Sequence, residues 1–267
     1  MKTKFENYTE FMYSKLEEHT SKDTDQTKRI KYALMRRLLI AETIESGCAN
    51  MSEVSLNEYG SYERPIGPDY EFPGGFGNMI NFFADKLPED AIKTSHPVRH
   101  ITFADREPNN TNTAMLVECF NGVKYKAQHV VVTTSSSYLK HNYMSLFNPA
   151  LLNEQKILAI NSICMNTVDK IFLFYDDLEF FPAQIETLHP IFLEAESEFG
   201  HRIEKNWHTK LSSVNRFYDN VLMVWITGVE AHYIENLEDA EIATTLTNCF
   251  RRLLANKDVP MPNKIIK

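Results

Sequence analysis

The segment Asn166-Thr-Val-Asp-Lys-Ile-Phe-Leu-Phe-Tyr175 decides how the chain folds. β-Branched and aromatic residues dominate it and acidic residues follow at once, a pattern that predicts a strand. Alternation with a period of two sorts its side chains into two faces, one with Val168, Lys170, Phe172 and Phe174 and one with Asp169, Ile171, Leu173 and Tyr175. The strand therefore places a lysine in an otherwise apolar row.

Two interpretations of Lys170 follow from this placement. In the first, the lysine lies near the strand end and extends its ammonium into water, because fully buried lysines are rare. In the second, the amine is desolvated, its pKa is lowered, and it is poised for proton or water chemistry. The strand alone does not decide between them.

Length, composition and charge limit the classes of protein to which this chain can belong. The 267 residues suffice for one large core or two modest domains, and the 43% hydrophobic and 24% charged content is typical of a globular protein. No apolar run approaches the roughly 20 residues that cross a bilayer, and the start has no apolar signal core. The formal charge of −8 argues against a nucleic-acid binder and suits a cationic substrate, although it also serves solubility.

The cysteines and histidines indicate neither a disulfide framework nor a metal site. The four cysteines lie far apart without a CxxC pair, which favours a reduced intracellular chain. The nine histidines show no HExxH or other ligand spacing. We therefore expect a cytoplasmic protein without a metal.

The N-terminal part is predicted to be helical, over residues 5–19 and from about Thr27 to Ser46. The second helix has an apolar stripe and a stop signal at Gly47, the stripe comprising Ile30, Ala33, Leu34, Leu38 and Ala41. Glu42 and Glu45 fall three apart near its C-terminal end, where the helix dipole favours cations instead. A solvated acidic face is the ordinary interpretation of this pair.

A glycine-rich turn and a set of strands follow. Phe72-Pro-Gly-Gly-Phe-Gly77, which includes Gly75, leads into a helix near Asn78–Leu87; such glycines let backbone approach a phosphate or a ring, but the spacing is not G-x-G-x-x-G and a plain turn is the alternative. Strands are predicted over Val98–Phe103, Ala114–Phe120 and Val123–Tyr125, with a turn at Asn109–Asn112.

The run Gln128–Ser135 is continuous and apolar enough to predict a central strand buried on both faces. It ends in small residues, among them Thr133 and Thr134, which would abut a ligand at the strand's carboxyl end or simply turn into a capped helix from Ser136. Further helices are predicted over residues 152–160 and Asp239–Leu254, and a strand over Val221–Gly228. Residues 183–219 show no clear periodicity.

In order along the chain, several motifs resemble the flavin-dependent amine oxidase family, most closely its spermine oxidase and acetylpolyamine oxidase branch. They are Glu42-x-x-Glu45-Ser, Tyr59-Gly60, Pro73-Gly-Gly-Phe76, Pro97-Val98-x-x-Ile101, Val130-Val-Val-Thr133, Asp169-Lys170-Ile-Phe-Leu173, Phe180-Phe-Pro182 and Trp225-x-x-Gly228-x-x-Ala231. The family's G-x-G-x-x-G opening and its closing Phe-Ala-Gly-Glu segment are absent, and Ser137 and Phe181 stand where the family often has Gly and Trp. The resemblance thus implies the middle of a longer enzyme.

The resemblance implies an α/β fold with mixed helices and strands, in which two domains are interleaved. Residues 1–69 would be the helical part of a substrate domain, 70–162 a partial FAD-binding segment, and 163–267 the sheet part of the substrate domain, a mixed sheet flanked by helices.

The implied reaction is FAD-dependent oxidation of a polyamine to an aldehyde and an amine, with oxygen reoxidising the flavin and peroxide released. The partners would be a polyamine and oxygen, with no nucleic acid or membrane; whether the polyamine is spermine, spermidine or an acetylated form stays open, as does a peroxisomal location. By the same resemblance Lys170 would hold a water at flavin N5, Glu45 and Glu42 would meet a substrate nitrogen, and the cofactor would contact Val98, Thr133, Thr134 and Gly75.

Two rival functions remain. A histone-lysine demethylase has the same fold, but neither its chromatin-binding module nor its long coiled-coil insertion is visible, and Glu42 and Glu45 favour small polycations. A non-catalytic remnant, folded and binding a protein partner without flavin, is the rival from another class.

Overall fold

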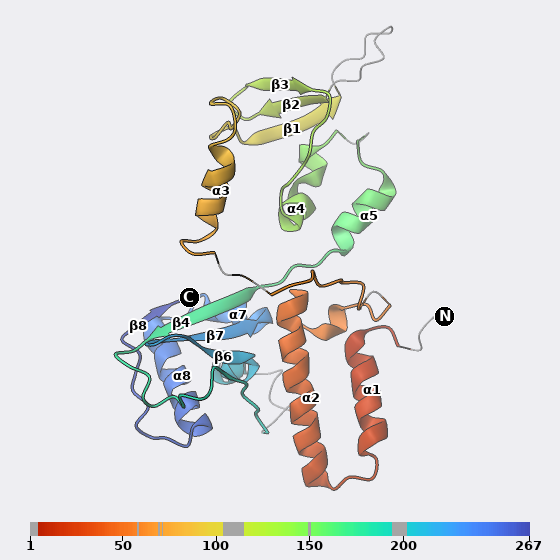
Figure 1. The fold of residues 1–267 in the computed structure, drawn as a ribbon. Coiled ribbons are helices and arrows are strands. Elements are labelled where there is room, and N and C mark those ends of the chain that lie inside the picture. Colours follow the sequence, from red (N-terminus) through yellow and green to blue (C-terminus); the bar gives the residue numbers. More distant parts are fainter. Residues whose placement is uncertain are drawn as a thin grey trace. The chain divides into compact units, whose positions relative to one another are not determined.

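The computed structural model describes residues 5–57, 59–68, 70, 72–103, 115–148, 151–193 and 202–267. It comprises two compact units (Figure 1), one formed by residues 1–63 and 165–267 and the other by residues 64–164. We call them the five-stranded unit and the three-stranded unit after their sheets. The chain thus leaves the first unit after Glu63 and returns to it at Met165, whereas the predicted domains divide at residues 69 and 162. Their assignment to FAD and substrate binding stays a prediction.

In its described residues, the five-stranded unit contains a sheet, five α-helices and two 3-10 helices. Its elements are α1 (Tyr8–Thr20), α2 (Asp25–Ser46), η1 (Met51–Glu53), β4 (Val168–Phe174), β5 (Thr187–Leu188), α6 (Ile203–Asn206), η4 (Trp207–Lys210), β6 (Ser213–Tyr218), β7 (Val221–Thr227), α7 (Gly228–Ile234), α8 (Asp239–Leu253) and β8 (Lys264–Ile266).

The predicted strand around Lys170 lies near the middle of this sheet. The strand order is β5-β6-β7-β4-β8, and all of these pairs are antiparallel. In the β4–β7 register, Lys170 lies opposite Trp225 and Phe172 opposite Met223. The two predicted faces of β4 are confirmed, because Ile171 and Leu173 are fully buried whereas Lys170 is exposed.

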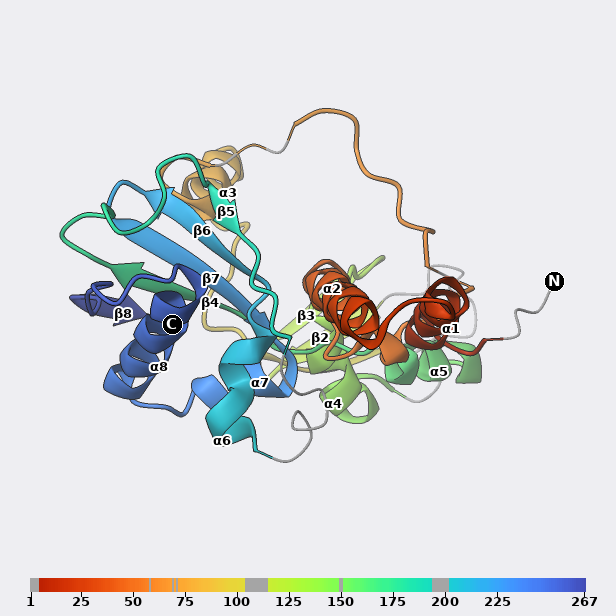
Figure 2. The ribbon, with the colours of Figure 1, turned by 90° about the horizontal axis from the view of Figure 1, so that it is seen from below.

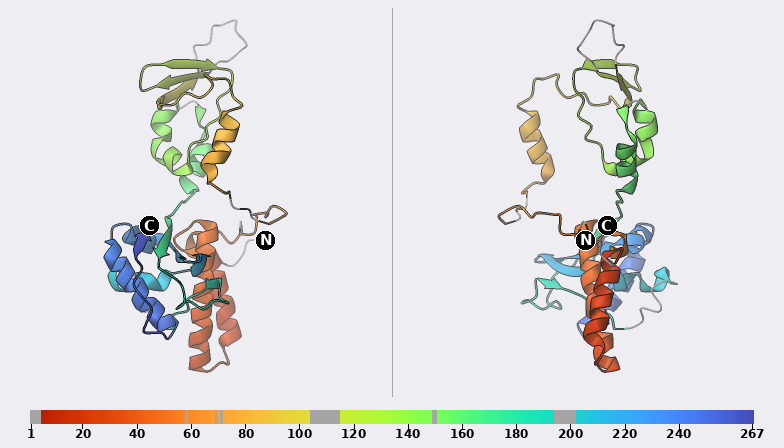
Figure 3. Two further views of the ribbon diagram at one scale, coloured as in Figure 1. Left: turned by 60° about the vertical axis from the view of Figure 1, so that its left-hand side comes forward. Right: turned by 90° about the vertical axis from the view of Figure 1, so that its right-hand side faces the viewer.

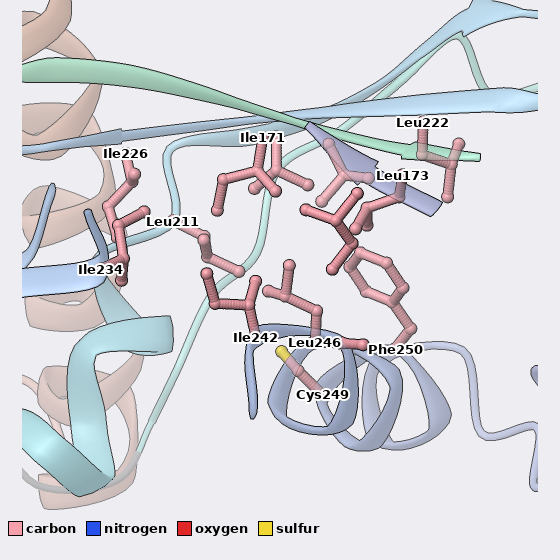
Figure 4. Close-up of a cluster of buried hydrophobic side chains, with 14 of the residues drawn as sticks. Ile171, Leu173, Leu211, Leu222, Ile226, Ile234, Ile242, Leu246, Cys249 and Phe250 are labelled. Atoms are coloured by element: carbon pink, nitrogen blue, oxygen red, sulfur yellow. The ribbon is translucent and has the colours of Figure 1, made fainter. Parts of the chain in front are cut away.

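One face of the sheet forms the core of the unit. Side chains from β4, β7 and α8 interdigitate there (Figure 4), among them Ile171, Leu173, Leu222, Ile242, Leu246 and Phe250. Helix α8 lies along this face (Figure 2). The sequence predicts inward side chains at Ile242, Leu246, Phe250 and Leu253; the first three are buried, and Leu253 is half-buried against the same core. Fully burying one Leu, Ile or Phe side chain contributes roughly 1.5–3 kcal/mol, so this face dominates the stability of the unit.

Helices α1 and α2 form an antiparallel hairpin, side by side in Figures 1 and 3. Thr24 caps the start of α2 by accepting from the Thr27 amide, and Gly47 ends it in the left-handed conformation, as predicted. The predicted apolar stripe is wrong in part: Ile30, Leu34 and Leu38 are 41–49% exposed, whereas Ala33, Leu39, Ile40 and Thr43 are buried. Helix α2 is apolar on both flanks, and its packing on α1, η1 and β7 selects the second set.

The three-stranded unit is a small antiparallel meander with three helices. Its elements are α3 (Phe76–Ala84), β1 (Val98–Phe103), β2 (Met115–Cys119), β3 (Lys124–Ala127), α4 (Ser136–Leu146) and α5 (Glu154–Ser162). The bounds of β1 are those predicted from the sequence, and Ser135 caps α4. The predicted turn at Asn109–Asn112 lies outside the described residues.

The predicted central strand over residues 128–135 is wrong. The segment belongs to no strand, and Val131 within it is 84% exposed. A strand buried on both faces requires hydrogen-bonded neighbours and covering layers, and no strand among the described residues pairs with this segment. Its apolar character alone therefore does not make it a strand here.

Candidate functional site

The second face of the five-stranded sheet carries a mixture of aromatic, cationic and neutral polar side chains. We call it the open sheet face and define it by the strand residues that alternate to this side: Val168, Lys170, Phe172, Phe174, Thr187, Ser213, Asn215, Phe217, Val221, Met223, Trp225, Thr227, Lys264 and Ile266. The core helix α8 packs on the opposite face (Figure 2). No member of this set is Asp or Glu.

Lys170 is the cation at the centre of this face. Its side chain is exposed, and its Nζ lies 4.4 Å from the centroid of the Trp225 ring, directly across the β4–β7 register. Such a cation–π contact at an exposed site contributes about 0.5–1 kcal/mol and limits the directions in which the ammonium points. In the five-stranded unit the Lys170 side chain is therefore exposed and lies over the Trp225 ring, and its role stays a prediction.

The acidic pair lies at the C-terminal end of α2. Glu42 is half-buried, and its Oε2 accepts a hydrogen bond of 2.6 Å from the Tyr59 hydroxyl, whose ring contacts that of Tyr8 at 4.0 Å between centroids. The hydrogen bond to Glu42, with burial and Tyr8 adding to it, raises the pKa of Tyr59 well above its usual range. Tyr59 thus remains a neutral donor that orients Glu42, whereas Glu45 is exposed.

Hydrogen bonds connect the C-terminal end of α2, which carries Glu42 and Glu45, to β7 and to the start of β4, the strand that carries Lys170. The hydroxyls of Thr43 and Thr227 are 2.8 Å apart and buried, and Thr227 lies opposite Val168 in the sheet. The amide of Asn166, just before β4, donates to the carbonyl of Gly47, the C-cap of α2, at 3.1 Å. Within the five-stranded unit, the predicted carboxylates and the predicted lysine therefore belong to one connected arrangement.

The predicted cofactor residues all lie in the three-stranded unit. Val98 begins β1 and is half-buried, and Thr133 and Thr134 are exposed in the segment before α4. Gly75 precedes α3 with a φ of 81°, which L side chains rarely adopt, and a Cβ there would meet nothing within 4 Å. No hydrogen bond joins these four residues to one another in the described part of the chain.

A separate cavity of about 250 Å³ lies between α1, α2 and η1. Its lining includes Arg36, Thr43, Met51 and Lys210. It opens on a different side of α2 from Glu45, and none of the predicted site residues lines it.

Among the described residues, His, Cys, Asp and Glu side chains form no group of three suited to a metal ion. No helix in the described ranges is both long enough and apolar enough to span a membrane.

The profile of the family described as "Flavin containing amine oxidoreductase" matches residues 15–267. The chain belongs to this family. The family predicted from the ordered motifs is therefore confirmed, and with it a flavin-dependent class of oxidoreductases.

The chain is similar in sequence to proteins that are named as oxidases of polyamines. The chain is 27% identical to the bovine (Bos taurus) peroxisomal N(1)-acetyl-spermine/spermidine oxidase and 26% identical to the human (Homo sapiens) one, covering 97% of this chain and 52% of each relative. It is 23% identical to probable polyamine oxidase 5 of Arabidopsis thaliana, over 88% of this chain and 43% of the relative. The chain thus spans about half the length of the curated relatives it matches.

Solved structures show the same fold. Cyclohexylamine oxidase from Brevibacterium oxydans IH-35A matches with a TM-score of 0.57 at 14% identity, over 96% of this chain and 52% of that one. A putative protoporphyrinogen oxidase from Exiguobacterium sp. 255-15 matches with a TM-score of 0.50 at 12% identity, over 85% and 44%. The predicted α/β class of an amine oxidase is thereby confirmed.

Sequence reasoning missed several residues that build the site. The sequence motifs contain Trp225 and Tyr59 but do not indicate that Trp225 contacts Lys170 or that Tyr59 donates to Glu42, which the structure shows. Thr43 carried no signal beyond its place beside Glu42. An alternation template applied to β7 would have placed Trp225 and Thr227 on one face and so could have indicated them.

Proposed function

We propose that this chain forms part of an FAD-dependent polyamine oxidase, which oxidises a polyamine C–N bond to an aldehyde and an amine and passes the electrons to oxygen, releasing hydrogen peroxide. The observation that carries the proposal is Lys170 on the open sheet face, connected through α2 to the carboxylates of Glu42 and Glu45. Family membership and the names of the polyamine oxidase relatives support it.

The open sheet face suits a flavin ring in its chemistry. It offers aromatic and apolar surface for a planar ring, one central ammonium at Lys170, and no carboxylate. A cation beside the ring would stabilise the negative charge of a reduced flavin, and because the open sheet face has no carboxylate, no negative side chain on it would repel that charge. In the three-stranded unit, the positive φ of Gly75 leaves the backbone before α3 open to close approach. Bound FAD would supply the hydride acceptor.

The chain's own residues would bind the substrate and handle protons. Glu45, exposed at the end of α2, would hold a protonated nitrogen of the polyamine, and Glu42, oriented by the Tyr59 hydroxyl, would stand beside it. The nitrogen at the reacting carbon must be neutral, because only its lone pair can stabilise the developing iminium. Lys170 would hold a water, and through it a proton, at the open sheet face.

Two matched lysine variants test this role. Lys170→Met and Lys264→Met each remove an ammonium from the open sheet face, and Lys264 likewise lies over an aromatic ring, that of Phe174 at 5.6 Å. We expect Lys170→Met to slow polyamine-dependent flavin reduction or reoxidation by about 10²-fold or more, as for loss of a positioned proton-transfer group. We expect Lys264→Met to leave both rates within a factor of about two. Equal rates in the Lys170 variant and the unchanged protein would remove Lys170 from the mechanism.

A folded, non-catalytic interaction module is the second candidate. The exposed Val131 segment and helix α3, which has no buried residue, favour it because they leave apolar surface available to a protein partner. The visible absorption spectrum of the purified chain, before and after incubation with FAD, separates the two candidates. A flavin spectrum that bleaches on anaerobic addition of a polyamine supports the oxidase. A colourless, cooperatively folded chain that takes up no FAD supports the module.

A further inference from the structure

The cavity between α1, α2 and η1 contains none of the predicted site residues, and its lining is positively charged. Two of the lining residues are cations, Arg36 on α2 and Lys210 at the end of η4, and none of the described residues that line it is Asp or Glu. Over the whole chain, acidic side chains outnumber Lys and Arg by 36 to 28, so this lining reverses the overall charge. A concave surface with cations and without carboxylates attracts an anion.

The two cations of the lining are held in different ways. Lys210 is half-buried, and none of the ion pairs between described residues involves its ammonium. Arg36 is fixed by its Nη2 group, which donates to the carbonyl of Phe192 at 2.8 Å. A guanidinium carries five N–H groups, and this bond uses one of them. The cavity therefore combines an anchored guanidinium with an ammonium that can pair with a ligand.

Two neutral groups of the lining can also donate hydrogen bonds to an anion. The Oγ1 atom of Thr9 is buried and has no hydrogen-bond partner in the part of the chain that the structure describes. A buried hydroxyl without a partner costs free energy, which a ligand that accepts from it would recover. Asn50 accepts from the Ser52 amide through Oδ1 at 3.0 Å and so caps η1, and its donor group, Nδ2, takes no part in that cap.

The size of the cavity and its apolar walls limit the ligand further. Leu39, Ile40 and Met51 line it and are buried. An apolar cavity of about 150 Å³ holds a benzene ring, so about 250 Å³ has room for a ring with one small charged group. An inorganic anion would leave the apolar walls uncovered, and an uncharged apolar molecule would leave Lys210 and Thr9 unmatched. The lining therefore fits a compact organic anion.

We propose that this cavity binds a small organic monocarboxylate, with its carboxylate held by Lys210 and Thr9 beside the Arg36 guanidinium and its apolar body against the buried aliphatic walls. Lys210 belongs to η4, Thr9 to α1 and Arg36 to α2, so the bound carboxylate would connect three elements of the five-stranded unit. The inference does not depend on the proposed oxidation, because it uses no flavin and none of the residues assigned to that reaction.

Benzoate is the probe, and benzamide, which has the same ring without the charge, is its matched control. Calorimetry measures the dissociation constants of both for the full chain. We expect one benzoate per chain and at least about tenfold weaker binding of benzamide, because benzamide forms no charge-assisted hydrogen bond with Lys210. Inorganic phosphate should also bind at least about tenfold more weakly than benzoate, because it covers none of the apolar walls.

Three variants locate the binding. Lys210→Met removes the ammonium and should weaken benzoate binding at least about tenfold while leaving benzamide binding unchanged. Lys205→Met removes the same charge from α6 at an exposed position outside the lining and should leave benzoate binding within a factor of about two. Thr9→Val should weaken benzoate binding about two- to tenfold without lowering the urea midpoint of the unliganded chain, because valine removes a hydroxyl that has no partner there.

A further variant, Lys210→Gln, covers a failure of Lys210→Met to fold and should show the same loss of benzoate binding. The inference is overturned if the unchanged protein binds no benzoate, or if benzamide or phosphate binds as tightly as benzoate. Retention of full benzoate affinity in a folded Lys210 variant overturns it as well. A chain whose flavin bleaches with a polyamine but which binds no benzoate loses only this inference, whereas a chain that binds benzoate as expected without taking up FAD loses only the oxidase proposal.

Discussion

Valine at position 43 would break the buried hydrogen bond that ties the acidic end of α2 to the sheet. Thr43 Oγ1 donates to the carbonyl of Ile40 at 2.6 Å. A hydroxyl has one proton, so the Thr227 hydroxyl must be the donor in the 2.8 Å contact with Thr43. Both threonines are buried, at 4% and 3% exposure, so neither hydroxyl gains water when its partner is removed.

Because the Thr227 hydroxyl donates and Thr43 accepts, the two single variants should lower the free energy of unfolding by different amounts. Thr43→Val leaves the donor of Thr227 buried without an acceptor and should lower the free energy of unfolding by about 1–3 kcal/mol. Thr227→Val removes the hydroxyl that donates to Thr43 Oγ1, but Thr43 still donates to the Ile40 carbonyl and so keeps one hydrogen bond. This variant should therefore lower the free energy of unfolding by only about 0.5–1.5 kcal/mol. The double variant should cost less than the sum, since it contains no orphaned hydroxyl.

Thr247 is the matched control for the same substitution. It lies on α8 at 1% exposure, and its hydroxyl has no hydrogen-bond partner in the part of the chain that the structure describes. Valine keeps its shape and removes an unsatisfied buried hydroxyl, so Thr247→Val should raise the free energy of unfolding by about 1 kcal/mol.

Urea titration followed by tryptophan fluorescence measures all of these variants. Both tryptophans, Trp207 and Trp225, lie in the five-stranded unit, so the signal follows the unit that contains the threonines. Opposite signs for Thr43→Val and Thr247→Val are the expected result. The reasoning is refuted if the two substitutions lower stability equally, or if Thr227→Val costs more than Thr43→Val.

Three further predictions use the same unfolding measurement. Leu222→Ala, at a fully buried position between the sheet and α8, should lower the free energy of unfolding by about 2.5–5 kcal/mol and shift the urea midpoint accordingly. Burial raises the pKa of the Cys249 thiol from 9.0 to about 12, and burial also raises that of Tyr175. Because these folded-state pKa values exceed the unfolded ones, stability should fall as pH rises from about 9 toward 12, and Cys249→Ala should flatten that fall. Burial, with Arg252 adding to it, lowers the pKa of His208 below 6.5, so stability should fall as pH drops below 6.5. A His208→Gln variant that keeps the full acid dependence would contradict this assignment.

Local signals determined the elements that carry their own pattern. The β-branched and aromatic alternation around Lys170 predicts β4 and its two faces, because a strand's side-chain period follows from backbone geometry alone. Gly47 ends α2 since glycine adopts the left-handed conformation at little cost. The stripe of Ile242, Leu246, Phe250 and Leu253 predicts the buried side of α8 because the large apolar residues of this helix lie on that one side.

Where a local pattern admits two outcomes, only tertiary packing decided between them. Helix α2 is apolar on two flanks, and its packing against α1, η1 and β7 determines which flank is buried. The run at residues 128–135 is apolar enough for a central strand but has no paired neighbour among the described residues. Short elements within residues 183–219, such as β5 and β6, gain their stability from partners in the sheet and show no period of their own.

The sequence by itself determined the family, most of the helices and strands, and the residues that motifs single out, Lys170, Glu42 and Glu45. The tertiary structure alone decided what surrounds them: Trp225 under the ammonium of Lys170 and the Tyr59 hydroxyl on the carboxylate of Glu42. The physical reason is that side-chain period and capping are properties of neighbouring residues. A cation–π contact or a hydrogen bond between residues such as Thr43 and Thr227 depends instead on how distant segments pack.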